Sequence, residues 1–152
     1  MRVTREVAIA ASATSLWALL WDVRRIVECL PGCVDAREVE PHRRYAARME
    51  QRVGPISLSV PLDVKVMEAE EPHRLALDAK GKDPVIGAEV VARVVLDVAS
   101  LGEESLLRID AEGRILGRLG ALGQGVIQRK AEEIIEEFGA RLRRAAEAKQ
   151  QQ

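Results

Sequence analysis

The stretch that decides the fold is the C-terminal segment at residues 116–149, which reads LGRLGALGQGVIQRKAEEIIEEFGARLRRAAEAK. At about 100° per residue, its apolar side chains fall on one stripe and most of its charged side chains fall on the opposite side. The stripe consists of Ile127, Ala131, Ile134, Ile135, Phe138, Leu142 and Ala145. This periodicity predicts one long amphipathic helix that covers a whole sheet.

The first turns of the same segment contain glycine where the stripe would require bulk. Continued backwards, the stripe passes through Gly123, Gly120 and Gly117. Glycine costs a helix about 1 kcal/mol relative to alanine. The segment is therefore either partly a loop or a helix that is hollowed beneath its N-terminal half. Both alternatives leave space between the helix and the sheet.

Size and composition predict a single domain over residues 1–152. The chain is 47% hydrophobic and 31% charged, which is typical of a globular protein. Its net charge of −1 argues against a nucleic-acid binder with a basic stripe. No apolar run approaches the length that spans a bilayer, and charged residues interrupt the N-terminal segment where a signal peptide would be apolar. We expect a cytoplasmic protein, and many Arg and Glu with few Asn, Gln and Cys are typical of thermophiles.

The remaining chain predicts short elements that are separated by turn residues. A strand at residues 3–9 precedes helices at 13–21 and 23–29, with Ser12 as the N-cap of the first helix. Strands follow at residues 34–39, 44–53, 56–68, 74–80, 88–98 and 105–112. Their short connections favour antiparallel pairing. The fold class is therefore α+β: a curved antiparallel sheet of about seven strands, in the order β-α-α-β6-α, wrapped around the C-terminal helix.

The inward faces of these strands are aliphatic and contain many small residues. They could form a tightly packed core, or they could line an apolar pocket, which typically has about 300–1,000 Å³. The helix glycines favour the pocket. The candidate ligand-binding residues are Tyr45, Met49, Leu58, Val60, Leu77, Val90, Ala92, Val94, Ile109, Gly120, Gly123 and Ile127.

Several landmarks carry a resemblance to a known family. They are Leu16-Trp17-Ala18-Leu19-Leu20 with Asp22, Glu28-Cys29-Leu30-Pro31-Gly32-Cys33, Val53-Gly54-Pro55-Ile56, Glu71-Pro72-His73-Arg74-Leu75, and a tail with Gly117, Leu119, Leu122-Gly123, Ile127, Glu137-Phe138 and Leu142. The chain resembles the G-subunit family of carbon monoxide dehydrogenase, within the START-like, polyketide-cyclase-like helix-grip (SRPBCC) superfamily.

This resemblance implies a helix-grip fold of the START-like and Bet v 1-like kind, in which the sheet grips the C-terminal helix around an apolar cavity. It also implies association with a molybdenum-containing hydroxylase and with the cytoplasmic face of the membrane. A hydrophobic small molecule, either a quinone or a lipid, is the ligand that such a carrier would hold.

Catalytic and metal-binding patterns find little support. Cys29 and Cys33 could be a redox pair, a disulfide or half of a metal site, but His42 and His73 lack metal-ligand spacing. A turn that packs two small apolar side chains is the favoured interpretation. No serine lies in a nucleophile elbow. We therefore expect no metal, no cofactor and no catalytic constellation.

Leu119, Leu122 and Val126 flank the glycine stripe rather than filling it. They could pack against the loop at residues 81–87, which is the favoured alternative. They could instead form, with Arg118, an exposed rim that contacts a membrane or a partner. Nearby arginines would suit anionic lipid headgroups.

Three functions are compatible with these residues. The leading hypothesis is a cytoplasmic binding protein for a hydrophobic ligand, located peripherally at the inner face of the membrane. The second is an enzyme of the cyclase or dehydratase kind that uses polar groups at the mouth of the cavity, such as Arg5 or Gln51. The third is a structural adaptor with a filled core.

Overall fold

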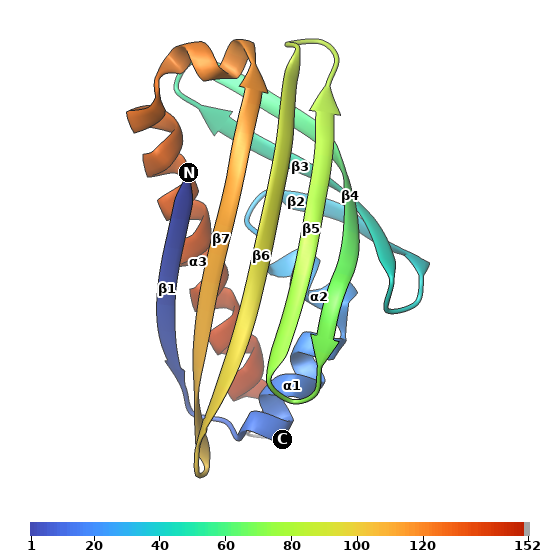
Figure 1. The fold of residues 1–152 in the computed structure, drawn as a ribbon, viewed down its shortest axis with the longest axis vertical. Coiled ribbons are helices and arrows are strands. Elements are labelled where there is room, and N and C mark those ends of the chain that lie inside the picture. The colour runs from blue at the N-terminus through green and yellow to red at the C-terminus, as the bar shows by residue number, and fades with distance from the viewer. Residues whose placement is uncertain (151–152) are drawn as a thin grey trace.

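Seven antiparallel strands form one curved sheet, in the order β1-β7-β6-β5-β4-β3-β2. The computed structural model describes residues 1–150, and Figure 1 views the sheet with the helices behind it. The elements are β1 (Arg2–Ile9), α1 (Ala13–Trp21), α2 (Val23–Cys29), β2 (Cys33–Glu40), β3 (Arg44–Val53), β4 (Ile56–Glu70), β5 (Arg74–Asp83), β6 (Ala88–Leu101), β7 (Glu104–Gly117), the 3₁₀ helix η1 (Arg118–Leu122) and α3 (Gln124–Gln150). The predicted α+β helix-grip architecture is confirmed.

Alternation along the strands decides which face is covered by the helices. On β4, Leu58, Val60, Leu62 and Val64 are all buried, whereas the residues between them are exposed or half-buried. This period of two places every second side chain on the concave face. A register shift between Val66 and Glu68, where β4 pairs with β5, lies in the long strand that bends most visibly in Figure 1.

The two short helices close one end of the sheet. The Ser12 side chain accepts a hydrogen bond from the Ser15 backbone N–H, so the predicted N-cap is confirmed. Trp17 is buried in the core, and its ring stacks on Trp21 at 6.0 Å between centroids. Trp21 stacks in turn on His42 at 4.0 Å, which ties α1 to the β2–β3 turn.

The C-terminal half of α3 is the part that anchors the helix to the rest of the fold. Phe138, Leu142 and Ala146 are each at most 1% exposed. Gly139 allows the helix to approach the sheet closely, because an added Cβ would lie 3.1 Å from the Val7 side chain and 3.3 Å from that of Ile109. The predicted apolar stripe is therefore confirmed from Ile127 onward.

The predicted helix is wrong over residues 116–123. Strand β7 continues to Gly117, η1 follows, and α3 begins at Gln124. Gly117 and Gly123 have φ angles of +90° and +91°, which a right-handed helix cannot contain and which glycine adopts readily. At Gly117 a Cβ would also clash with the carbonyl oxygen of Gly87. These glycines permit two chain reversals, so the loop alternative holds.

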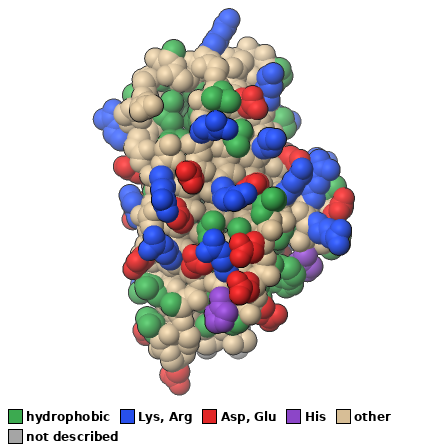
Figure 2. All heavy atoms as spheres, in the orientation of Figure 1, with side chains coloured by type: hydrophobic (Ala, Val, Ile, Leu, Met, Phe, Trp, Pro, Cys, Tyr) green, Lys and Arg blue, Asp and Glu red, His purple; other side chains and the backbone are tan. Residues whose placement is uncertain are grey.

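The outer face of the sheet is covered by ion pairs between neighbouring strands. Arg93 donates two hydrogen bonds to Asp78, and Arg2 does the same to Asp110. These hydrogen bonds to guanidinium groups hold the pKa values of both carboxyls below their usual range. Figure 2 shows the acidic and basic side chains interleaved across the middle of this face, which leaves the concave face as the place for an apolar site.

Candidate functional site: an apolar cavity under the first half of α3

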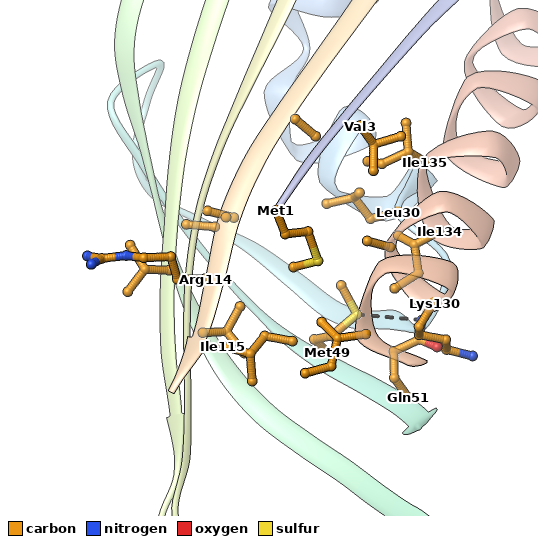
Figure 3. Close-up of a pocket in the computed structure, with 18 of the residues that line it drawn as sticks. Met1, Val3, Leu30, Met49, Gln51, Arg114, Ile115, Lys130, Ile134 and Ile135 are labelled. Carbon is orange, nitrogen blue, oxygen red and sulfur yellow. Dashed lines mark hydrogen bonds between the residues drawn. The ribbon is translucent and has the colours of Figure 1, made fainter. Parts of the chain in front are cut away.

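A cavity of about 180 Å³ lies between the sheet and the N-terminal half of α3. Figure 3 shows it from the side, with β7 and β1 on one wall and α3 on the other. Its apolar lining comprises Met1, Val3, Leu30, Met49, Val53, Leu58, Val60, Leu62, Ala79, Val90, Val91, Ala92, Val94, Ala111, Ile115, Ile127, Ala131, Ile134 and Ile135. The core is therefore not filled along its whole length.

The cavity exists because small residues from several elements face one another. Ala92 and Ala111 lie on neighbouring strands, Gly113 follows on β7, and Ala131 faces them from α3. At the other end of the same core, the larger side chains of Leu107, Ile109 and Phe138 are all at most 1% exposed. Protein interiors normally pack at crystal-like density. The small side chains around Ala92 and Ala131 cannot fill the space between the sheet and α3, so a cavity is left there.

Seven of the twelve predicted ligand-binding residues line this cavity. They are Met49, Leu58, Val60, Val90, Ala92, Val94 and Ile127. Tyr45, Leu77 and Ile109 are buried elsewhere in the core. Gly120 and Gly123 do not line the cavity and are exposed, because the segment that carries them turns away as η1 instead of continuing α3 over the sheet. Whether the seven contact a ligand stays a prediction.

Some lining residues were not among the predicted set. Ala131 and Ile134 belong to the predicted helix stripe, so their position was available from the periodicity. Leu30 and Met1 had no such signal, because they lie in a turn and before the first strand. Their approach to α3 depends on tertiary packing.

Gln51 is the one polar residue in the inward-facing row of β3, between Met49 and Val53. Its side-chain Nε2 donates to the Pro31 carbonyl oxygen at 2.5 Å, and also lies 3.7 Å from the Met49 sulfur. The other charged or polar side chains on the lining belong to Glu112, Arg114 and Lys130. Figure 3 shows Arg114 pointing away from the cavity, and Gln51 and Lys130 on its α3 side.

Arg5 does not belong to the cavity. Its side chain lies at the margin of the sheet, where the guanidinium pairs with Glu136 of α3 at 2.9 Å. Of the two polar groups proposed for the mouth, only Gln51 lines the cavity.

A second cleft of about 500 Å³ adjoins the cavity. The two spaces share the residues Met1, Gly113, Arg114, Ile115 and Ile127. Strand β1 pairs with β7 as far as Glu112, and beyond that residue β7 is paired only with β6, as far as Gly117. Figure 3 shows the Met1 side chain in this gap. The cavity and the cleft therefore meet beside Met1.

The two cysteines are free thiols on either side of the Leu30-Pro31-Gly32 turn. Burial raises the pKa of Cys33 to about 11 and raises that of Cys29 as well. Reactive cysteines have lowered pKa values. The pair is accordingly a packing feature of the turn, which agrees with the favoured interpretation of the sequence.

The predicted contact surface of Leu119, Leu122, Val126 and Arg118 is only partly available. Leu119 is fully buried, because η1 folds back against β7 and α3 instead of extending the helix. Leu122 and Val126 are half-buried, and Arg118 is exposed. Leu119 is therefore wrong as a contact residue.

Other apolar side chains are exposed at the same end of the molecule. Val85, in the β5–β6 turn, is 87% exposed and Leu116 is 44% exposed. Exposed basic residues accompany them at Arg52, Lys82, Arg114, Arg118 and Arg129. Between Gly113 and Ala131 the chain has four basic residues and no acidic one. Figure 2 shows mainly basic and apolar side chains toward this end.

Asp83 supports the turn at this end, although its sequence context gave no sign of this role. Its side chain is 5% exposed, and the carboxylate accepts hydrogen bonds from the backbone N–H groups of Ser59, Val85 and Ile86. Burial alone would raise its pKa, but these three donors outweigh burial and lower the pKa. Strand β5 reaches Asp83 instead of ending at Lys80 as predicted, because pairing with β6 continues to Ala88.

Helices long and apolar enough to span a bilayer do not occur within the described part of the chain.

Comparison with known proteins agrees with this architecture. Residues 6–147 match the family described as the carbon monoxide dehydrogenase G subunit (CoxG). No curated protein matches the chain. A conserved protein from Geobacillus kaustophilus is 17% identical, with 96% of this chain and 95% of that chain covered and a TM-score of 0.82.

Two further solved structures share this fold. A START superfamily protein from Mycobacterium smegmatis is 14% identical, with 97% of each chain covered and a TM-score of 0.73. The Zhui aromatase/cyclase from Streptomyces sp. R1128 is 16% identical, with 97% of this chain and 93% of that chain covered and a TM-score of 0.65. At these identities the likeness concerns the fold alone. The family match spans nearly the whole chain, and the chain therefore belongs to the CoxG family of carbon monoxide dehydrogenase.

Proposed function

We propose that this protein binds a quinone-like or lipid-like molecule in the cavity beneath the first half of α3. The observation that carries the proposal is a cavity with a nearly continuous aliphatic lining that adjoins an open cleft. Transfer of apolar surface from water into such a site contributes about 25 cal/mol per Å². Family membership supports the proposal, because the family is named for a component of a redox enzyme.

The size of the cavity limits what it holds at rest. At about 180 Å³ it is close to engineered apolar cavities of about 150 Å³ that bind benzene. One or two rings, or a short stretch of acyl chain, match this volume. A longer tail would extend through the gap beside Met1 into the adjoining cleft.

Native mass spectrometry of the purified protein, followed by organic extraction, tests this proposal. We expect a lipophile to co-purify with the wild type, and we expect Ala131→Leu to lose it because the new side chain fills the cavity. Ala148→Leu is the matched control, since Ala148 is exposed on the same helix. An empty wild-type protein whose melting temperature is unaffected by a panel of quinones and lipids would contradict the proposal.

The mode of action that we propose is carriage without chemical change. Gln51 and Lys130 can donate hydrogen bonds at the cavity, and apart from Glu112 and Arg114 the rest of its lining is apolar. The fold of an aromatase/cyclase supports the enzyme alternative only at the level of architecture. A ligand recovered with an unaltered mass after prolonged incubation agrees with carriage, whereas a time-dependent mass change would support catalysis.

We also propose that the basic, apolar end of the molecule contacts the inner face of the membrane. Val85 and Leu116 could enter the headgroup region while Arg118 and Arg129 pair with anionic lipids, at about 1 kcal/mol each. Sedimentation with phosphatidylglycerol-containing vesicles, compared with pure phosphatidylcholine, tests this contact. The double variant Arg118→Glu, Arg129→Glu should stay in the supernatant, whereas Arg43→Glu in the distant β2–β3 turn should sediment like the wild type.

Recruitment of a molybdenum-containing hydroxylase is the most specific part of the proposal, and its only support is membership of the family. Affinity purification from cells that express both proteins tests it, with molybdenum in the eluate as the readout. Purification of the chain without molybdenum under these conditions would contradict recruitment.

A further inference from the structure

The cavity has one pole at which a polar group of the ligand could be recognised. The inward rows of β4 and β6 are entirely aliphatic where they line the cavity, whereas the inward row of β3 carries Gln51. An amide in such a position has to satisfy its own hydrogen-bonding groups. The way in which Gln51 does so shows what it can offer to a ligand.

The orientation of the Gln51 amide is determined by its partner. The Pro31 carbonyl oxygen can only accept a hydrogen bond, so the group beside it is the Nε2 amine and not the oxygen. One of the two amine hydrogens is thereby used. The turn that carries Pro31 packs tightly here, since a Cβ at Gly32 would lie 2.6 Å from Nε2. The amide therefore has little freedom to rotate away.

The second amine hydrogen has only a weak acceptor. Its nearest partner is the Met49 sulfur at 3.7 Å, and a thioether accepts hydrogen bonds poorly. Both Met49 and Gln51 line the cavity. A carbonyl oxygen on a ligand in the cavity would be a much better acceptor. The hydrogen bond that it accepts would replace only the weak contact with the Met49 sulfur.

We infer that Gln51 recognises a carbonyl oxygen on the ligand, through its second amine hydrogen. The ligand class is then a lipophile whose apolar body fills the chamber and whose ketone or quinone carbonyl lies at the β3 pole. This inference rests on the proposed ligand-binding function of the cavity and narrows its ligand class. A hydrocarbon without a carbonyl group would bind through burial of its apolar surface alone, and its affinity would not depend on the Gln51 amide.

The test uses 1-tetralone and tetralin, two probes that share a bicyclic skeleton and differ in one carbonyl. Their dissociation constants are measured for the wild type and for Gln51→Met, which keeps the side-chain length and removes the amide. A neutral hydrogen bond contributes about fivefold in affinity. We therefore expect the tetralone-to-tetralin affinity ratio to fall about fivefold in Gln51→Met, with tetralin binding nearly unchanged. An unchanged ratio would overturn the inference, although tetralin binding would still support the cavity.

Two further measurements distinguish recognition by Gln51 from recognition by a neighbouring side chain. Lys130→Met should leave the ratio as it is in the wild type, and loss of the preference in that variant alone would assign recognition to Lys130. In the wild type, the side-chain amide resonances of Gln51 should shift with tetralone and not with tetralin, which requires no variant to fold. Failure of both probes to bind would overturn the ligand-binding function and this inference together.

Discussion

The two halves of α3 differ in how they pack. The C-terminal half is buried in the core, whereas the N-terminal half covers the cavity. In the C-terminal half, Phe138 and Leu142 belong to the hydrophobic core and are at most 1% exposed. In the N-terminal half, Ala131 and Ile134 face Ala92 and Gly113, and the cavity lies between them. The amphipathic pattern of the helix is continuous across both halves. The difference therefore comes from the side-chain volume on the strands opposite, and it divides the molecule into an anchor and a binding end.

Truncation of one large side chain in each half should show the largest difference. Leu142→Ala creates a cavity in a closed core and should lower the free energy of unfolding by about 3 kcal/mol. Ile134→Ala enlarges a space that is already open and should cost about 1 kcal/mol, because fewer packing contacts are lost. Urea denaturation of both variants measures the comparison. Equal losses would mean that the two halves are packed alike.

The same glycine substitution should have different effects in the two halves of α3. Gly125 has open space around the Cβ position, whereas a Cβ at Gly139 would press on Val7 and Ile109. We expect Gly125→Ala to raise the free energy of unfolding by about 0.5 kcal/mol through helix propensity. At Gly139 an overpacking cost of about 1 kcal/mol should outweigh this gain, so Gly139→Ala should be about 1 kcal/mol less stable than Gly125→Ala. Thermal melts in parallel measure the difference, and a larger gain at Gly139 would refute tight anchoring.

The binding end should depend on pH through Asp83. The folded state lowers the pKa of this carboxyl, so its contribution to stability is present above the unfolded pKa of about 3.9 and is lost as the pH falls through the lower folded value. Asp83→Asn should therefore lower Tm by about 3 °C at pH 7, and the difference from the wild type should shrink below pH 4. A difference that stays constant from pH 7 to pH 3 would argue against a charged Asp83 in the turn.

The smallest expected effect is on the alkylation rate of Cys33, which lies beside the Pro31 turn. With a pKa of about 11, Cys33 is almost entirely protonated at pH 8. We expect iodoacetamide to label it at least about tenfold more slowly in the folded protein than in urea, because the thiolate is the nucleophile. Peptide mass spectrometry gives the rate. Rapid labelling of folded Cys33 would show that the turn around Pro31 opens, and that the β3 pole of the cavity is less rigid than its contacts indicate.

Much of this fold follows from periodicity. The helices at residues 13–21 and 23–29 and the strand at 44–53 have the predicted bounds, because caps, turns and alternation agree there. The end of β7 and the start of α3 were not predictable in the same way. When the helical periodicity is extended toward the N-terminus, Gly117, Gly120 and Gly123 fall on one stripe. In the structure, Gly117 and Gly123 have positive φ angles, which a right-handed helix does not contain. Spacing does not report backbone conformation.

The sequence predicted which residues face the concave side of the sheet. It did not predict how much of that side remains open as a cavity. Met49, Val60 and Val94 were identified because alternation assigns them to the concave face. Tyr45 and Ile109 share that face, but the structure places them beside other side chains, away from the cavity. The space left open depends on which residues meet across the core, and that is a property of tertiary structure. Gln51 was noticeable from the sequence as a polar residue in an inward row, whereas its bond to Pro31 was not.

The most direct test of a binding end in this molecule is a methyl NMR titration of the wild-type protein with tetralin. We expect saturable shifts for the methyl groups of Val90, Ile127 and Ile134, which line the cavity. The methyl groups of Leu107 and Leu142, in the anchor, should stay unchanged. Saturable shifts confined to the first set would establish an apolar binding site under the first half of α3. Shifts that do not saturate, or that spread equally over both sets, would contradict it.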